Sequence, residues 1–139
     1  MQGLKSLNRK LTRTIPEAVR AEVRKVMEAK AEEVAAMMRR LAPRWLAPSI
    51  EWGWGPPPSG AVRLWQGGKG DLLISIYSTD FRARWFEFGT GERVQKSTGR
   101  RTGRITAQPY FYPSWRANKR RAKSAIARAM RKGIKQGAR

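Results

Sequence analysis

The sequence contains no cysteine and no histidine among its 139 residues. Without cysteine, the chain has no disulfide framework, no thiolate nucleophile and no thiolate metal site. Without histidine, it lacks the commonest general base and the commonest metal ligand. Catalysis would then need a carboxylate pair or an activated serine or lysine, and the spacing of the ten acidic residues suggests no such site. We therefore expect a non-enzymatic protein that needs no cofactor and no metal.

Long hydrophobic runs are also missing. No apolar segment approaches the roughly 18 residues that a membrane helix needs, and no signal-peptide pattern opens the chain. Apolar residues make up 40% of the sequence, which argues against disorder throughout. The length allows one modest core. We expect a soluble cytosolic product without membrane contact, folded as a single domain over residues 1–139.

Negative charge is scarce and unevenly placed. Thirty Lys and Arg residues stand against ten Asp and Glu residues, which gives a formal net charge of +20. All ten acidic residues lie at or before Glu92, whereas fifteen of the thirty basic residues lie from Arg93 onward. Such asymmetry indicates a polyanionic partner, nucleic acid first, or a surface that is charged only for solubility. Composition leaves both interpretations open.

Helical spacing of apolar residues predicts two long helices. In residues 15–41 the apolar positions recur every three or four residues between charged ones. Thr14 is suited to cap this helix, and Pro16 is tolerated in its first turn. A second helix is predicted over residues 113–134. Residues 1–13 place three leucines among basic residues and form either a short amphipathic helix or a basic arm that orders on assembly.

Between these helices the pattern changes to strands and turns. Alternating apolar residues predict three strands, at 50–54, 62–66 and 72–77. The glycine-rich residues 67–71 favour a hairpin turn over a phosphate loop, because the Gly-Lys-Ser/Thr ending and a following helix are missing. A short helix ending at Gly89 and a basic segment, 92–106, complete the chain; this segment is a flexible loop or a long hairpin.

Together the elements predict an α+β fold. We expect a small antiparallel sheet of three to four strands packed against a long N-terminal helix and a long C-terminal helix, with a short helix before the basic loop.

Two stretches are more specific than these patterns. Residues 83–90, Ala-Arg-Trp-Phe-Glu-Phe-Gly-Thr, resemble the A-x-x-hydrophobic-E-F-G-T signature of a phage neck and tail-completion family, that of the tenth gene product of phage HK-ninety-seven. Residues 107–115, Ala-Gln-Pro-Tyr-Phe-Tyr-Pro-Ser-Trp, are similar to the family's A-x-P-F-hydrophobic-x-P-A-hydrophobic motif before its last helix. Ala42-Pro43 followed by Ser49-Ile50 resembles the family's passage out of its first helix.

The sequence departs from the family pattern at three places. Tyr110 stands where the family has phenylalanine, and Ser114 where it has alanine. Residues 44–47, Arg-Trp-Leu-Ala, replace the family's Thr-Gly-x-Leu element.

The resemblance implies a structural virion protein at the head–tail junction of a long-tailed phage. Such proteins join the tail to the DNA-filled capsid as tail-completion, terminator or connector subunits, often in sixfold rings. The implied partners are further copies in a hexameric ring, other phage neck and tail proteins, and DNA crossing the junction. The implied location is the virion, after assembly in the host cytoplasm. No catalytic residues come with the resemblance.

Two groups of residues are candidates for partner contact. The basic loop is expected to face DNA at the junction or an acidic neighbouring ring; its candidates are Arg93, Lys96, Arg100, Arg101 and Arg104. Glu87 and Trp45 are candidates for the subunit interface. An ion pair from Glu87 to an arginine of a neighbouring subunit competes with a solvated or intrachain carboxylate.

Aromatic residues near Glu87, namely Trp85, Phe86 and Phe88, are expected in the core. A different class of function, a free-standing basic nucleic-acid-binding protein, remains the alternative. The basic C-terminal helix supports it, although the sequence has no helix-turn-helix, zinc-finger or RNA-binding signature.

Overall fold

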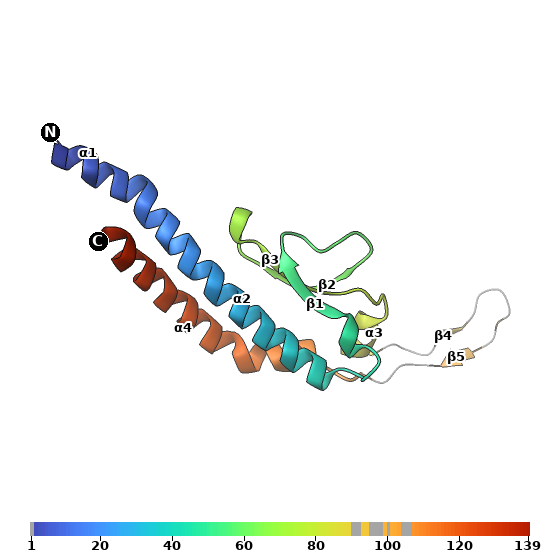
Figure 1. Ribbon diagram of the computed structural model, residues 1–139. Coiled ribbons are helices and arrows are strands. Elements are labelled where there is room, and N and C mark those ends of the chain that lie inside the picture. Colours follow the sequence, from blue (N-terminus) through green and yellow to red (C-terminus); the bar gives the residue numbers. More distant parts are fainter. Residues whose placement is uncertain (1, 90–92, 95–98, 100, 104–106) are drawn as a thin grey trace. The chain divides into compact units, whose positions relative to one another are not determined.

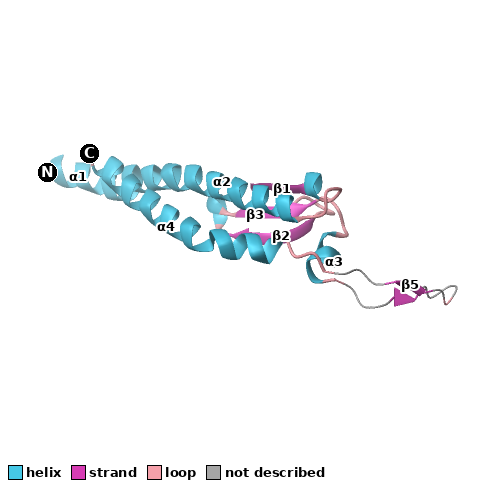
Figure 2. Cartoon of the chain, turned by 90° about the horizontal axis from the view of Figure 1, so that it is seen from below, coloured by secondary structure: helices cyan, strands magenta, loops and turns pink. Residues whose placement is uncertain are grey.

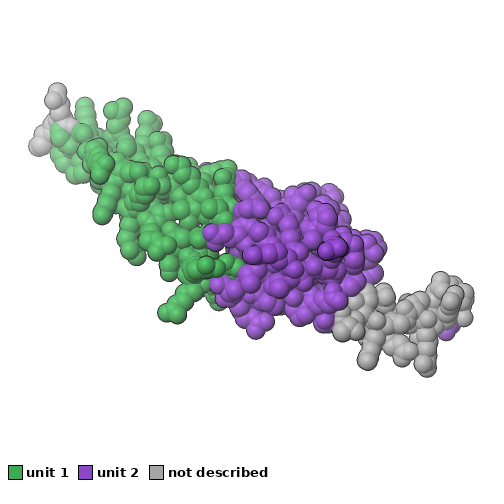
Figure 3. All heavy atoms as spheres, turned by 60° about the horizontal axis from the view of Figure 1, so that its bottom comes forward, with its two compact units in different colours: residues 1–31, 118–139 green, residues 32–117 purple. Residues whose placement is uncertain are grey.

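The computed structural model describes residues 2–89, 93–94, 99, 101–103 and 107–139 (Figure 1). By their internal contacts, residues 1–31 and 118–139 form one compact unit, unit 1, and residues 32–117 form another, unit 2 (Figure 3). Both boundaries fall inside the long helices α2 (Ile15–Leu41) and α4 (Phe111–Ala138), so each of these helices contributes to both units. The single domain expected for the chain stays a prediction.

Unit 2 is built on a three-stranded antiparallel sheet in the order β1-β3-β2 (Figure 2). The strands are β1 (Ile50–Trp54), β2 (Val62–Gly67) and β3 (Ile74–Ser78). The central strand β3 is the most buried, because both of its edges are paired and its faces are covered. A bulge in β2 between Arg63 and Trp65 shifts the register with β3. The sheet confirms the predicted α+β class with its three strands.

The core of unit 2 lies between this sheet and the helical segments of the unit. Val34, Ala35 and Met38 of α2 pack with Ile50 and Ile76 of the sheet, and all five are buried. The remaining buried members of the cluster are Ala42, Leu46, Ala83, Tyr110 and Phe111. Burial of this apolar surface is the main stabilising term of the unit.

A polar clamp joins α2 to β1. The Glu32 carboxylate accepts hydrogen bonds from Trp52 Nε1 at 2.7 Å and from Arg39 Nη1 at 3.0 Å. Arg39 Nε also donates to the Ile50 carbonyl at 2.9 Å. The hydrogen bond from Trp52, helped by Arg39, holds the pKa of Glu32 below its usual value. Trp52 therefore has a defined intrachain partner for its indole nitrogen.

Unit 1 is an antiparallel helix pair. Glycines of α4 bring the two backbones close: a Cβ on Gly133 would lie 2.5 Å from Val19 Cα, and one on Gly137 would lie 2.6 Å from Ile15 Cα. Farther along, Lys132 Nζ and Glu22 Oε2 are 3.5 Å apart. Small residues thus permit an approach that larger side chains would block.

The N-terminal segment corrects the predicted helix start. Residues 2–14 are helical, as α1 (Gln2–Arg9) and η1 (Lys10–Thr14), and continue into α2, so Thr14 does not cap a helix. Pro16 therefore lies inside a helix, where its ring removes a backbone donor and collides with the carbonyl four residues earlier. The wider π turn of η1, in which the Ile15 N–H donates to the Lys10 carbonyl, accommodates the proline at this point.

Other boundaries differ slightly from the predictions. The short 3-10 helix η3 (Gly70–Leu72) precedes β3, which begins at Ile74. The short helix α3 spans Ala83–Phe88, and α4 begins at Phe111 and so includes Pro113. The predicted hairpin turn between β2 and β3 is confirmed by their antiparallel pairing.

Candidate functional site

Glu87 connects α3 to the start of α4. Its side chain is buried, with 6% of the residue exposed. One carboxylate oxygen accepts the backbone N–H groups of Tyr110 at 2.7 Å and of Phe111 at 2.9 Å, and the other accepts that of Tyr112 at 3.1 Å. Of the two alternatives that the sequence left open for Glu87, these bonds fit the intrachain carboxylate; its place in a subunit interface stays a prediction.

These bonds account for the free donors at the start of α4. The first four positions of a helix have no intrahelical acceptor for their N–H groups. Here those positions run from Tyr110 to Pro113; Glu87 binds the first three N–H groups, and proline has none. The carboxylate also places a negative charge beside the positive end of the helix dipole, which stabilises the helix start. A residue 23 to 25 positions away in sequence thus caps α4.

Tyr110 and Ser114 strengthen the same connection. Tyr110 is fully buried, and its hydroxyl donates to the Ala83 carbonyl at 2.6 Å. The Ser114 hydroxyl donates to the Tyr110 carbonyl, and the Gln108 N–H donates to the Phe86 carbonyl at 2.7 Å. The two motifs 83–90 and 107–115 are therefore each other's hydrogen-bonding partners. Both hydroxyls belong to positions where the sequence departs from the family pattern, and each adds a bond there.

We expect Tyr110→Phe to lower the free energy of unfolding at pH 7 by about 1–2 kcal/mol, because the buried Ala83 carbonyl loses its donor. Burial, followed by the nearby charge of Glu87, raises the pKa of Tyr110 above 10.0 in the folded chain. Above about pH 10 the unfolded chain releases this proton first, so wild-type stability falls as the pH rises further. Urea unfolding at pH 7 and 11 measures both effects. The free energies of unfolding of wild type and Tyr110→Phe should differ by about 1 kcal/mol less at pH 11 than at pH 7. An equal difference at both pH values would contradict the buried hydrogen bond of Tyr110.

Exposed aromatic side chains surround α3. Trp45, Phe81, Phe88 and Tyr112 are 45%, 67%, 66% and 46% exposed. Phe88 and Tyr112 meet edge to face at 5.9 Å, and the Arg82 guanidinium lies 4.1 Å from the Trp45 ring centroid. The contacts form two groups, Trp45 and Phe81 around Arg82 and Phe88 with Tyr112. We call the five residues of these two groups the aromatic patch. Phe88 was expected in the core, and this prediction is wrong: in the six-residue α3, Ala83 and Glu87 occupy the buried positions.

Asp80 fixes the arginine of the aromatic patch. Its carboxylate accepts the Arg82 backbone N–H at 2.9 Å, the Nε–H at 3.0 Å and the Nη2–H at 2.9 Å. These bonds lower the pKa of Asp80. The two-pronged contact holds the guanidinium over the indole of Trp45, which also forms an edge-to-face pair with Phe86 at 4.9 Å.

The basic loop is only partly described. Arg93 lies in β4 (Arg93–Val94) and Arg101 in β5 (Arg101–Gly103), and these strands pair antiparallel, as the hairpin alternative requires. Lys96, Arg100 and Arg104 lie outside the described residues. Contact of this loop with DNA or an acidic ring stays a prediction.

Sequence reasoning missed the partner of Glu87 and most of the aromatic patch. Capping by a carboxylate so far away has no local signal, although Glu87 and Pro113 each stand in a motif. One feature of the sequence could have indicated the exposure of Phe81, Arg82 and Tyr112. Their segments intersperse aromatic with charged residues and are too short to bury all the aromatic side chains.

No cluster of metal-ligating side chains is found in the described parts of the chain. They contain no group of three or more acidic side chains that could hold a metal ion. An open depression of about 540 Å³ is lined by residues of the proline loop and β2 together with Arg84, without a carboxylate or hydroxyl. Across the described helices, none combines the length and apolarity needed to span a membrane.

The chain was compared with protein families, curated proteins and solved structures. One family model matches residues 5–89, more than half of the chain; it is described as bacteriophage HK97-gp10, a candidate tail component. The chain belongs to this family. No curated protein and no solved structure matches it.

Membership of the HK97-gp10 family identifies a bacteriophage structural protein of the tail-component class. A virion location and contact with other phage tail or neck proteins follow from that class, whose role is structural. The matched residues include Glu87, Trp45 and Phe81, but not the motif 107–115 to which Glu87 binds.

Proposed function

We propose that the chain is one subunit of a ring at the head–tail junction, where it joins the tail to the DNA-filled capsid. The observation that carries this proposal is the aromatic patch beside the Glu87 connection. Family membership supports the tail-component class, and the motif 107–115 resembles the neck and tail-completion pattern. The sixfold symmetry rests on the resemblance alone.

The composition of the aromatic patch favours a protein partner. Trp, Tyr, Phe and Arg are enriched at protein interfaces, and truncation of such anchors often costs 2 kcal/mol or more of binding. Phe81 and Phe88 each expose about two-thirds of their surface, which is unfavourable in an isolated chain. A neighbouring copy that covers the patch would bury them. Trp45 then contacts the neighbour directly, whereas Glu87 supports the patch by fixing α3 to α4.

Charge sets the conditions under which a ring forms. Six copies would carry six times the formal +20 of one chain, about +120. Self-repulsion between copies opposes assembly at low ionic strength, and salt or a bound polyanion reduces it. Assembly is therefore best measured near 0.3 M salt, where the Debye length is about 6 Å.

Phe81→Ser is expected to convert ring oligomers of the full chain to smaller species. Loss of about 2 kcal/mol per contact raises the concentration needed for assembly about 30-fold. Light scattering coupled to size exclusion measures the molar mass across a concentration series. Met130→Ser, which removes a side chain exposed to 47% in unit 1, is the control and should retain the wild-type mass.

Both variants should keep wild-type helical content, because both side chains are exposed. A wild-type chain that stays monomeric at every concentration, or equal masses for the two variants, would contradict the proposal. A monomer that binds DNA tightly would instead support the free-standing nucleic-acid-binding alternative.

A further inference from the structure

The positive charge is concentrated in the helix pair rather than in the basic loop. Unit 1 contains 17 basic and three acidic residues, and so carries +14 of the net +20. Unit 2 contains 13 basic and seven acidic residues, or +6, although the whole loop 92–106 belongs to it. A partner attracted by charge therefore meets its strongest field at unit 1.

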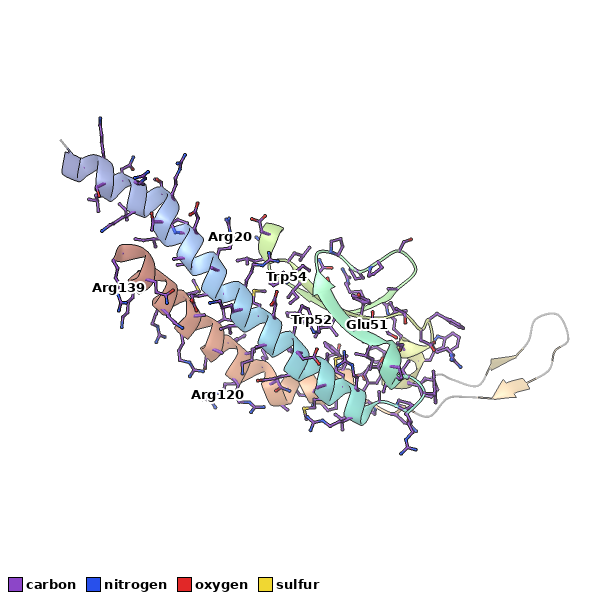
Figure 4. The ribbon with its side chains drawn as sticks, in the orientation of Figure 1. Arg20, Glu51, Trp52, Trp54, Arg120 and Arg139 are labelled. Atoms are coloured by element: carbon purple, nitrogen blue, oxygen red, sulfur yellow. The ribbon has the colours of Figure 1, made fainter. Side chains whose placement is uncertain are left out.

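Within unit 1, the segment 118–139 carries nine basic residues and no acidic residue. All nine are exposed, and the buried positions of this segment are Asn118, Ala122, Ala125, Ala129, Gly133 and Gly137. We call the nine basic side chains the α4 basic face. Figure 4 shows two of them, Arg120 and Arg139, on the side of α4 turned away from α2. The α4 basic face thus lies outside the packed stripe of the helix, and Lys132, which also pairs with Glu22, lies at its margin.

We propose that the α4 basic face binds the phosphate backbone of duplex DNA without sequence preference. Its cations run from Lys119 to Arg139, a helical path of about 30 Å, close to the roughly 34 Å of one turn of B-DNA. Lysine and arginine side chains neutralise phosphates and release counterions, which is the main source of non-specific affinity.

The chemistry of unit 1 favours duplex DNA over its competitors. Unit 1 contains no Phe, Trp or Tyr, so it offers no platform on which unpaired bases could stack. The same absence is unlike a protein interface, where aromatic anchors are enriched. A regular array of phosphates needs only cations spread along a rod, which the helix supplies. This inference does not depend on the ring at the junction.

Fluorescence anisotropy of a labelled 24-base-pair duplex, titrated with the full chain between 50 and 200 mM salt, tests the proposal. The test variant replaces four cations of the α4 basic face: Arg120→Gln, Arg128→Gln, Arg131→Gln and Lys135→Gln. The control replaces four exposed cations of unit 2: Arg44→Gln, Arg63→Gln, Lys69→Gln and Arg84→Gln. Each variant has a formal charge of +16, four below the wild-type +20.

Each phosphate contact contributes about −0.9 to the slope of log affinity against log salt. If the four test cations each contact a phosphate, the slope of the test variant is shallower by about 3.6, and its affinity loss over this salt range is about 100-fold smaller than that of wild type. The control should keep nearly the wild-type slope. The oligomer mass of each variant, measured by light scattering, separates loss of DNA binding from loss of assembly.

Three results would overturn the proposal. Equal slopes for the two variants would show that only total charge matters. Tighter binding of a single-stranded 24-mer than of the duplex would assign the face to unpaired strands. Tighter binding of polyglutamate than of the duplex would point to an acidic protein as the partner.

Discussion

Glu87→Ala is expected to lower the free energy of unfolding by about 3 kcal/mol. The substitution removes three charge-assisted hydrogen bonds and leaves the N–H groups of Tyr110, Phe111 and Tyr112 without an acceptor at a buried helix start. It also removes a negative charge from the positive end of α4. For a chain of 139 residues this corresponds to a drop of about 10 °C in the melting temperature. Thermal unfolding followed by circular dichroism measures the change.

Two further variants separate capping from a general effect of lost charge. Glu87→Gln keeps an acceptor oxygen of nearly the same shape and should cost less than Glu87→Ala. Glu17→Ala removes an exposed glutamate at the start of α2 and should change stability by about 0.5 kcal/mol or less. Similar melting temperatures for Glu87→Ala and Glu17→Ala would contradict the capping role.

Gly133→Ala is expected to destabilise the helix pair by about 2 kcal/mol, although alanine has the better helix propensity by about 1 kcal/mol. The new Cβ would lie 2.5 Å from Val19 Cα and 2.8 Å from Val19 N. Both are backbone atoms, so no side-chain rotation relieves the clash, and α4 must move away from α2. Urea unfolding followed at 222 nm measures the cost.

Gly3→Ala is the matched control for Gly133→Ala. Gly3 is also helical, in α1, but a Cβ there would meet nothing within 4 Å. It should gain up to about 1 kcal/mol or remain neutral. If Gly133→Ala also proves neutral or stabilising, the close approach of the two helices in unit 1 is wrong.

The regular elements were predictable from periodicity. The first long helix ends at Leu41 and the first strand spans residues 50–54, as their apolar patterns indicate. The start of α2 was misjudged because Thr14 and Pro16 form a good local signal for a helix beginning. In the structure the helix does not begin there, because the π turn of η1 accommodates Pro16 within a continuous helix.

The site was predictable only in part, for reasons that lie in its long-range contacts. Glu87 was identified as a candidate residue, but its partners are backbone amides more than 20 residues away. Every residue except proline has such an amide, so the sequence does not single these out. The exposure of Phe88 depends on which face of a six-residue helix is covered, and so on tertiary packing. Two glycines four residues apart in α4, Gly133 and Gly137, were a readable sign of close helix packing that composition alone did not reveal.

Charge illustrates the same limit. The sequence has an excess of basic residues after Glu92, which made the loop 92–106 the first candidate for a polyanion-binding surface. Most of the charge belongs to unit 1, a helix pair whose two segments come from opposite ends of the chain. The grouping needs the fold, because no local window contains both segments.

The central claim is a ring of this protein at the head–tail junction. Cryo-electron microscopy of intact virions, with an antibody fragment raised against the purified chain, tests it most directly. The proposal predicts one labelled collar between capsid and tail, and unjoined heads and tails when the gene is deleted. Label along the tail tube or at its distal end, or normal particles that lack the protein, would contradict it.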